Sequence, residues 1–152
     1  MTPPTTTAQG FASARLYTEV QQFYARQMNL LDGDAPDPEG WAATFTEDAV
    51  FDSNLQEEPD TGRAAILRSV REGIGHIYGG GPLDFRHWFG MIDVRPQSDG
   101  SLRTRYYALA MATPKGGSLN IRGSVLCRDR LVRQDGGWLV RRRELTADGA
   151  PR

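Results

Sequence analysis

The chain of 152 residues has a formal net charge of -1 and contains 39% hydrophobic and 24% charged residues. This length favours one domain with a real core, and the near-neutral charge gives no electrostatic basis for binding nucleic acid or an anionic membrane. Cys127 is the single cysteine, which excludes an intrachain disulfide, and no stretch nears the roughly 20 apolar residues of a membrane span.

The two ends of the sequence are predicted to be flexible. Residues 1–10 are rich in threonine and proline, and residues 147–152 are small or polar. The first residues lack the basic and apolar regions of a signal peptide, so we expect a cytoplasmic protein. Residues 11–146 contain no repeat or linker and are predicted to form a single domain.

Three helices are predicted in the first half of the chain. The first has an apolar face with three- and four-residue spacing: Leu16, Val20, Phe23, Tyr24, Met28 and Leu31. Asp37 is the expected N-cap of a short second helix that turns Trp41 and Phe45 inward. A strand at residues 48–53 precedes the third helix, which runs through residues 63–74 and is capped by Asp60 or Thr61.

Residues 73–82, GIGHIYGGGP, are predicted to form a mobile loop. The segment combines a proline with repeated glycines around His76 and Tyr78, and such a composition interrupts regular structure. Because glycines permit a hinge, the loop is a candidate lid over a binding pocket.

Four long strands are predicted to follow, at residues 83–95, 102–113, 119–133 and 138–145, with turns between them. Helices followed by an antiparallel meander indicate an α+β domain. A curved sheet wrapped around the helices would leave a cone-shaped cavity. Both faces of the first long strand are apolar, which indicates cover on both sides or a dimer interface.

The alternation of side chains along the strands assigns some residues to faces. Cys127 and Asp129 fall on the apolar inner face of their strand, where Cys127 is expected to serve packing. Asp129 is the one charged residue there and is expected to pair with an arginine of a neighbouring strand. Tyr106 and Tyr107 point to opposite faces, so one of them is expected to reach the interior.

The residues favour acid–base chemistry over other kinds of catalysis. Two histidines and one cysteine without short spacing do not indicate a metal site, and no phosphate-binding loop or serine nucleophile motif is present. His87 lies on a strand among aromatic residues, and Asp32 follows the first helix. A histidine beside a carboxylate moves protons at neutral pH. Spacing alone does not bring the two residues together, and for each of them a structural role stays open.

Four segments of the sequence resemble the SnoaL-like branch of the nuclear transport factor 2-like superfamily. They are FYARQMNLLDGDAPDPEGWAATFTEDAVFDS, TGRAAI, RHWFGMIDV and CRDRLVRQDGGWLVRRREL. The resemblance implies an α+β cone with a deep apolar pocket between the helices and the concave sheet. It also implies pairing of two copies through the outer face of the sheet.

Within this superfamily the chain is most similar to scytalone-dehydratase-like proteins, a group that includes bile-acid dehydratases and polyketide tailoring enzymes. In that group an aspartate after the first helix faces a histidine of the first long strand across the pocket. Asp32 and His87 stand at these positions. Leu31 replaces a tyrosine that often precedes the aspartate, and the segment YYALAMAT offers no match for a second histidine of the fungal dehydratase.

The resulting hypothesis is a cofactor-independent dehydratase or cyclase that acts on a hydrophobic hydroxy-carbonyl compound such as a polyketide. His87 is the expected base and acid, Asp32 its orienting partner, and Tyr24 or one of the strand tyrosines the donor to the carbonyl oxygen. The other residues expected to bind substrate are Trp41, Phe45, Phe89, Met91, Tyr107 and Asp129. Two alternatives stay open: a non-catalytic binding or assembly subunit, and an epoxide hydrolase or isomerase that uses Asp32 or Asp129.

Overall fold

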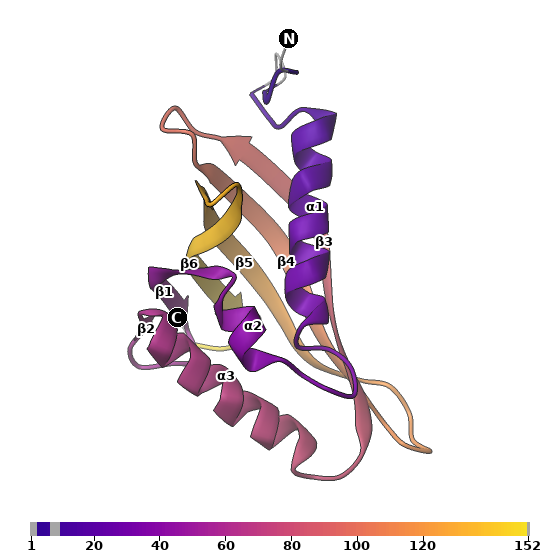
Figure 1. Ribbon diagram of the computed structural model, residues 1–152. Helices are drawn as coiled ribbons and strands as arrows, with labels where there is room; N and C mark the ends of the chain where they lie inside the picture. Colours follow the sequence, from indigo (N-terminus) through magenta and orange to yellow (C-terminus); the bar gives the residue numbers. More distant parts are fainter. Residues whose placement is uncertain (1–2, 7–9, 152) are drawn as a thin grey trace.

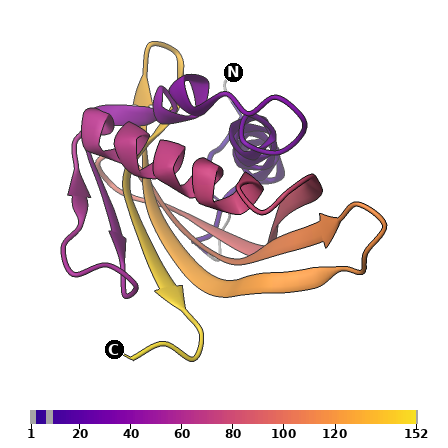
Figure 2. The same cartoon turned by 90° about the horizontal axis from the view of Figure 1, so that it is seen from below.

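Three helices pack on one face of a six-stranded sheet. The computed structural model describes residues 3–6 and 10–151. Its helices are α1 (Ala14–Asn29), α2 (Pro38–Ala42) and α3 (Arg63–Tyr78), and they lie on the concave side of the curved sheet (Figure 1, Figure 2). The predicted α+β fold is confirmed. The predicted flexible ends fall partly on residues 1–2, 7–9 and 152, which lie outside the described residues.

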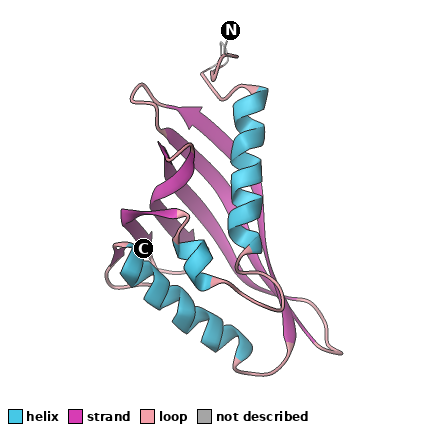
Figure 3. Cartoon of the chain, viewed as in Figure 1, coloured by secondary structure: helices cyan, strands magenta, loops and turns pink. Residues whose placement is uncertain are grey.

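The sheet is mixed, with one parallel pair among antiparallel ones. Its strands are β1 (Phe45–Ser53), β2 (Asp60–Thr61), β3 (Leu83–Pro96), β4 (Leu102–Pro114), β5 (Asn120–Gln134) and β6 (Gly137–Ala147). They follow the order β2-β1-β6-β5-β4-β3. Strands β3 to β6 form the predicted antiparallel meander, and β1 pairs in parallel with β6 (Figure 3).

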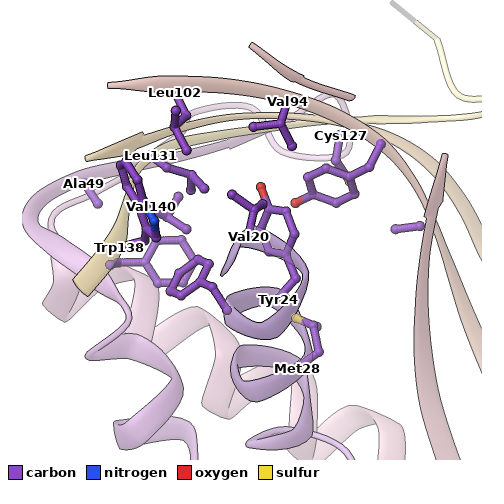
Figure 4. Packing of buried hydrophobic residues seen from close by; sticks show 14 of the residues in the cluster. Val20, Tyr24, Met28, Ala49, Val94, Leu102, Cys127, Leu131, Trp138 and Val140 are labelled. Atoms are coloured by element: carbon purple, nitrogen blue, oxygen red, sulfur yellow. The ribbon is translucent and has the colours of Figure 1, made fainter. Parts of the chain in front are cut away.

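The core forms between the apolar face of α1 and the strands beneath it. The Ser13 side chain accepts a hydrogen bond from the Leu16 amide and so caps the helix. The predicted face is buried at Leu16, Val20, Phe23, Tyr24 and Met28. Figure 4 shows Val20 and Tyr24 pointing from the helix toward Val94 and Cys127 of the sheet.

Helix α3 is longer than predicted. It continues through residues 73–78, so the prediction of a mobile loop there is wrong, and only residues 79–82 remain as a connection between α3 and β3. Gly73 and Gly75 have no neighbour at the place of a side chain, so their helical backbone needs no packing partner. The N-cap is Gly62, without a side-chain hydrogen bond, in place of Asp60 or Thr61.

A bulge in β3 reverses the predicted side-chain alternation. The pairing of β3 with β4 shifts between Gly90 and Asp93, and Met91 has a φ of 53°. Two residues of β3 therefore stand opposite one residue of β4. This bulge turns the Met91 side chain outward, where it is 75% exposed. Val94, four residues after Gly90, is buried again. The prediction that Met91 faces the pocket is wrong for this reason.

The opposite face of the sheet carries exposed apolar side chains, as the two-sided apolar character of the β3 sequence indicated. They include Trp88, Tyr107 and Ile121 on β3, β4 and β5. Across residues 3–6 and 10–151, no helix combines the length and apolar character needed to cross a bilayer.

Candidate active site

Asp32 and His87, which lie far apart in the sequence, are joined by two hydrogen bonds. The Oδ1 atom of Asp32 lies 2.8 Å from His87 Nδ1, and the backbone amide of His87 donates to Oδ2 at 2.8 Å. The Asp32 side chain is 10% exposed and the His87 side chain 23% exposed. Both carboxylate oxygens are thus committed to one residue, which fixes the position and the orientation of the imidazole ring.

The end of α1 places the carboxylate. The Asp32 amide donates to the carbonyl oxygen of Met28 at 3.1 Å, which continues the helical turn beyond Asn29. Gly33 follows with a φ of 115°, a conformation that favours glycine, and the chain turns away there. The segment between α1 and α2 thus holds the carboxylate of Asp32 against β3.

A carboxylate at Nδ1 leaves the other ring nitrogen of His87 available. Nδ1 is the donor in this contact, because an ionised carboxylate only accepts, so neutral His87 presents Nε2 as an acceptor. His87 lines a cavity of about 410 Å³, whereas Asp32 does not. This volume lies within the range of small-molecule sites. The pair has the arrangement of a general base held by an orienting carboxylate.

The cavity walls include some of the predicted residues and leave out others. Trp41 and Phe89 line the cavity as predicted. Phe45 is fully buried behind Trp41, with the two rings 4.7 Å apart, and has no part in the wall. Tyr107, which was expected to contact substrate, is 48% exposed on the outer face and lies outside this cavity. Tyr106, one of the two strand tyrosines expected to reach the interior, also lines the cavity. Wall residues that we did not predict include Leu31, Phe51, Ile66, Val70, Val125 and Arg143.

A second group of polar residues lies beneath the cavity, and we call Tyr24, Gln27, Tyr106, Asp129 and Arg143 the buried polar cluster. Arg143 Nε donates to Asp129 Oδ1 at 3.0 Å, and Arg143 Nη2 donates to Asp129 Oδ2 at 2.9 Å. The hydroxyl groups of Tyr24 and Tyr106 donate to Asp129 Oδ2 at 2.8 and 3.0 Å. Gln27 Oε1 accepts from Arg143 at 2.8 Å. The predicted ion pair between Asp129 and an arginine of a neighbouring strand is confirmed.

These contacts change the expected roles of Tyr24 and Asp129. Neither residue lines the cavity. Burial raises the pKa of Tyr24 and of Tyr106 well above the ordinary value, so both phenols stay protonated at neutral pH. The Tyr24 hydroxyl donates to Asp129, so this arrangement gives no support to the expected donation from Tyr24 to substrate. Asp129 accepts four hydrogen bonds and its side chain is fully enclosed, so this arrangement gives no support to the expected contact of Asp129 with substrate.

The guanidinium group of Arg143 stays charged in this setting. Burial alone lowers the pKa of Arg143, but the adjacent carboxylate of Asp129 more than offsets this and holds it above its usual value. The Arg143 Cζ atom lies 5.3 to 6.0 Å from the ring centres of Tyr24, Phe45, Phe89 and Tyr106.

We expect the thiol of Cys127 to be almost unreactive in the folded protein, although the residue lines the cavity. Burial raises the pKa of Cys127 to about 12, so nearly all of it is the unreactive thiol at pH 8. Ellman's reagent should modify the native chain far more slowly than the chain in urea. Equal rates would contradict the enclosure of Cys127.

The same shift makes folding stability depend on alkaline pH. The folded pKa is raised from 9.0, so the contribution of the thiol is complete below pH 9 and is lost as the pH rises toward 12. In Cys127→Ala, the decline in the urea midpoint between pH 8 and pH 10 should be shallower than in the wild type.

Among the described residues, no three histidine, cysteine, aspartate or glutamate side chains gather as metal ligands would. The described part of the chain therefore offers no candidate metal centre.

Comparisons with known proteins give a matching family model and several similar solved structures. The family model described as a SnoaL-like domain matches residues 12–144. A search of curated protein sequences gave no match. Aln2 from a Streptomyces species has 38% sequence identity and a TM-score of 0.82, with 91% of this chain and 94% of Aln2 covered.

Two further solved structures have similar identity. A protein from Catenulispora acidiphila in complex with S-DNPA is 37% identical with a TM-score of 0.76, and the match covers 90% of this chain and 96% of that one. ActVI-ORFA from Streptomyces coelicolor is 36% identical with a TM-score of 0.76, and the match covers 88% of this chain and 98% of that one. All three share the fold over nearly their whole lengths.

Proposed function

The chain belongs to the SnoaL-like family of the nuclear transport factor 2-like superfamily, and from this membership we propose that it is a cofactor-independent dehydratase or cyclase. Its substrate would be a hydrophobic hydroxy-carbonyl compound, such as a polyketide intermediate. The contact of Asp32 with His87 carries the proposal, since it engages Nδ1 of a histidine that lines an apolar cavity and leaves Nε2 for a substrate. The S-DNPA complex of the Catenulispora acidiphila protein supports a small-molecule ligand.

In the proposed reaction, His87 Nε2 removes the proton from the carbon next to the substrate carbonyl. The electrons of that C–H bond form the enolate, and the enolate then expels the hydroxyl group from the β carbon. The imidazolium returns its proton to the departing hydroxyl, which leaves as water. Asp32 stabilises the imidazolium between the two steps and keeps Nδ1 protonated throughout.

The alternatives receive less support from the geometry. A binding or assembly module would leave Asp32 and His87 apart or fill the cavity with aromatic side chains, and the described residues do neither. An epoxide hydrolase of the expected kind needs two carboxylates around an arginine. Arg143 meets the carboxylate of Asp129 on one side and the Gln27 amide on the other.

A minimal β-hydroxy ketone tests the proposal. Loss of water from 3-hydroxy-1-tetralone gives 1-naphthol after tautomerisation, and the product is followed by its fluorescence. We expect the wild-type protein to accelerate this reaction without added cofactor. In deuterium oxide, the protein should also exchange the protons next to the carbonyl of 1-tetralone, which has no hydroxyl group to lose. Binding of both ketones with neither reaction would favour a non-catalytic module.

We further propose a homodimer that forms through the outer face of the sheet, in the cytoplasm. The exposed side chains of Trp88 and Tyr107 support this assembly, because the two lie diagonally across neighbouring strands and form an apolar surface.

A further inference from the structure

Arg143 has hydrogen-bonding capacity that the fold leaves unused. Its Nε donates once, and the two protons of Nη2 go to Asp129 and Gln27. The two protons of Nη1 have no acceptor within residues 3–6 and 10–151. The residue as a whole is only 3% exposed, and a charged donor in such a setting is more favourable when each of its protons has a partner.

Two observations indicate that the unused donor faces the cavity. Arg143 is one of the residues that line the cavity. Among the described residues, three side-chain atoms are both fully enclosed and without a hydrogen-bond partner: Trp41 Nε1, Gln56 Oε1 and Arg130 Nε. Arg143 Nη1 is not one of these atoms. The Nη1 group is therefore accessible, and the cavity is the space that it reaches.

The surroundings fix Arg143 in place and prevent Asp129 from serving Nη1. Asp129 already accepts two hydrogen bonds from Arg143 and one each from Tyr24 and Tyr106. The paired charges are neutral overall, so the exposed Nη1 end suits an oxygen acceptor without requiring a full negative charge. Phe45 and Phe89 lie beside the guanidinium group and limit its lateral movement.

We propose that Arg143 binds an oxygen atom of the substrate through Nη1, at the part of the cavity wall formed by β6. The chemical class of that atom is a ring carbonyl or an ionised phenol. This inference deepens the proposed function, on which it rests, by specifying the polar recognition of its substrate.

The ring contacts of Arg143 limit the size of the compound. His87 is on β3 and Arg143 is on β6, with β4 and β5 between them. The sheet is curved and the helices lie on its concave side, so the two side chains come closer together than the path along the sheet suggests (Figure 2). Arg143 Cζ lies 5.8 Å from the ring centre of Phe89, which is two residues from His87 on β3. A bicyclic ketone is therefore a suitable size for a probe.

Binding of a matched pair of compounds tests the inference without turnover. The probes are 1-tetralone and tetralin, which share a bicyclic skeleton and differ by the carbonyl oxygen. We expect the wild-type protein to bind the ketone at least about 10-fold more tightly, because the oxygen gains a hydrogen bond from a charged donor. The Kd values are measured by quenching of tryptophan fluorescence.

Variants assign the preference to one residue. Arg143→Lys keeps the charge for Asp129 but has no second terminal nitrogen, so the two Kd values should become nearly equal. Arg142→Lys, at the neighbouring exposed position, and His87→Ala should keep the wild-type ratio. Loss of the preference in His87→Ala alone would overturn the inference, as would equal binding of both compounds by the wild type.

A measurement on the unchanged protein covers the case in which Arg143→Lys does not fold. The guanidinium ¹⁵N signals of Arg143 should shift on addition of 1-tetralone and not of tetralin. Unchanged signals at saturating ketone would overturn the inference. Failure of the proposed function is recognised separately, since a protein that binds through Arg143 without converting 3-hydroxy-1-tetralone loses only the reaction.

Discussion

His87→Ala is expected to lower kcat for dehydration by about 10²- to 10⁴-fold, the contribution of a positioned general acid and base. The imidazole is the group that joins the cavity to the Asp32 carboxylate, and alanine leaves no proton acceptor there. The fold should survive, because His87 is partly exposed and its backbone hydrogen bond to Asp32 remains. The measurement compares kcat for 3-hydroxy-1-tetralone with the thermal midpoint of the same sample.

His76→Ala is the matched control for this prediction. His76 is exposed in the last turn of α3 and does not line the cavity, so its replacement should leave kcat unchanged. Asp32→Asn should lose activity on the scale of His87→Ala, up to about 10⁴-fold, because an amide no longer holds the imidazole tautomer and its cation. Full activity in His87→Ala would move the chemistry to another residue.

Asp129→Asn is expected to destabilise the protein by about 3 to 5 kcal/mol, because Arg143 would keep a buried charge without its counterion. The side chains of both partners are almost fully enclosed. Urea unfolding at pH 7 measures the loss. Asp129→Leu combined with Arg143→Met should recover much of it, since an apolar pair of similar volume leaves neither charge buried.

Asp93→Asn supplies the comparison at the surface. Asp93 pairs with Arg95 at 2.8 Å, but both side chains are close to half exposed. The expected loss is well below about 1 kcal/mol. If Asp129→Asn does not fold, Tyr106→Phe removes one donor to Asp129 and should cost about 1 kcal/mol. Equal effects of Asp93→Asn and Asp129→Asn would contradict the stabilising role of the buried polar cluster.

Sequence patterns predicted the elements whose apolar residues repeat without interruption. The buried face of α1 follows from its spacing, and the four strands β3 to β6 follow from alternation and turn residues. The helical structure of residues 73–78 was not predicted, because a segment rich in glycine usually indicates a loop. A helix tolerates exposed Gly73 and Gly75 where no packing is needed, and the rest of α3 supports them.

The candidate site was predictable in part, for physical reasons. Family resemblance brought Asp32 and His87 together, although spacing alone did not. Alternation showed that Tyr106 and Tyr107 point to opposite faces, but it does not say which face is inside. An arginine partner of Asp129 was expected, but the place of Arg143 in the cavity wall was not. The pairing of β6 skips Arg141 between Val140 and Arg142, and this shift breaks the alternation that assigns the inner face.

The parallel pairing of β1 with β6 has a consequence for synthesis on the ribosome. Phe51 of β1 pairs with Arg143 of β6 and both line the cavity, so one wall of the cavity depends on a strand that emerges after the other five. Contacts between distant segments form slowly, because a long loop must close before they contribute. A nascent chain of which only β1 to β5 have left the ribosome contains Asp32 and His87, but it lacks β6 and with it Arg143. A truncated product would therefore expose apolar cavity walls and invite aggregation instead of providing a weak enzyme.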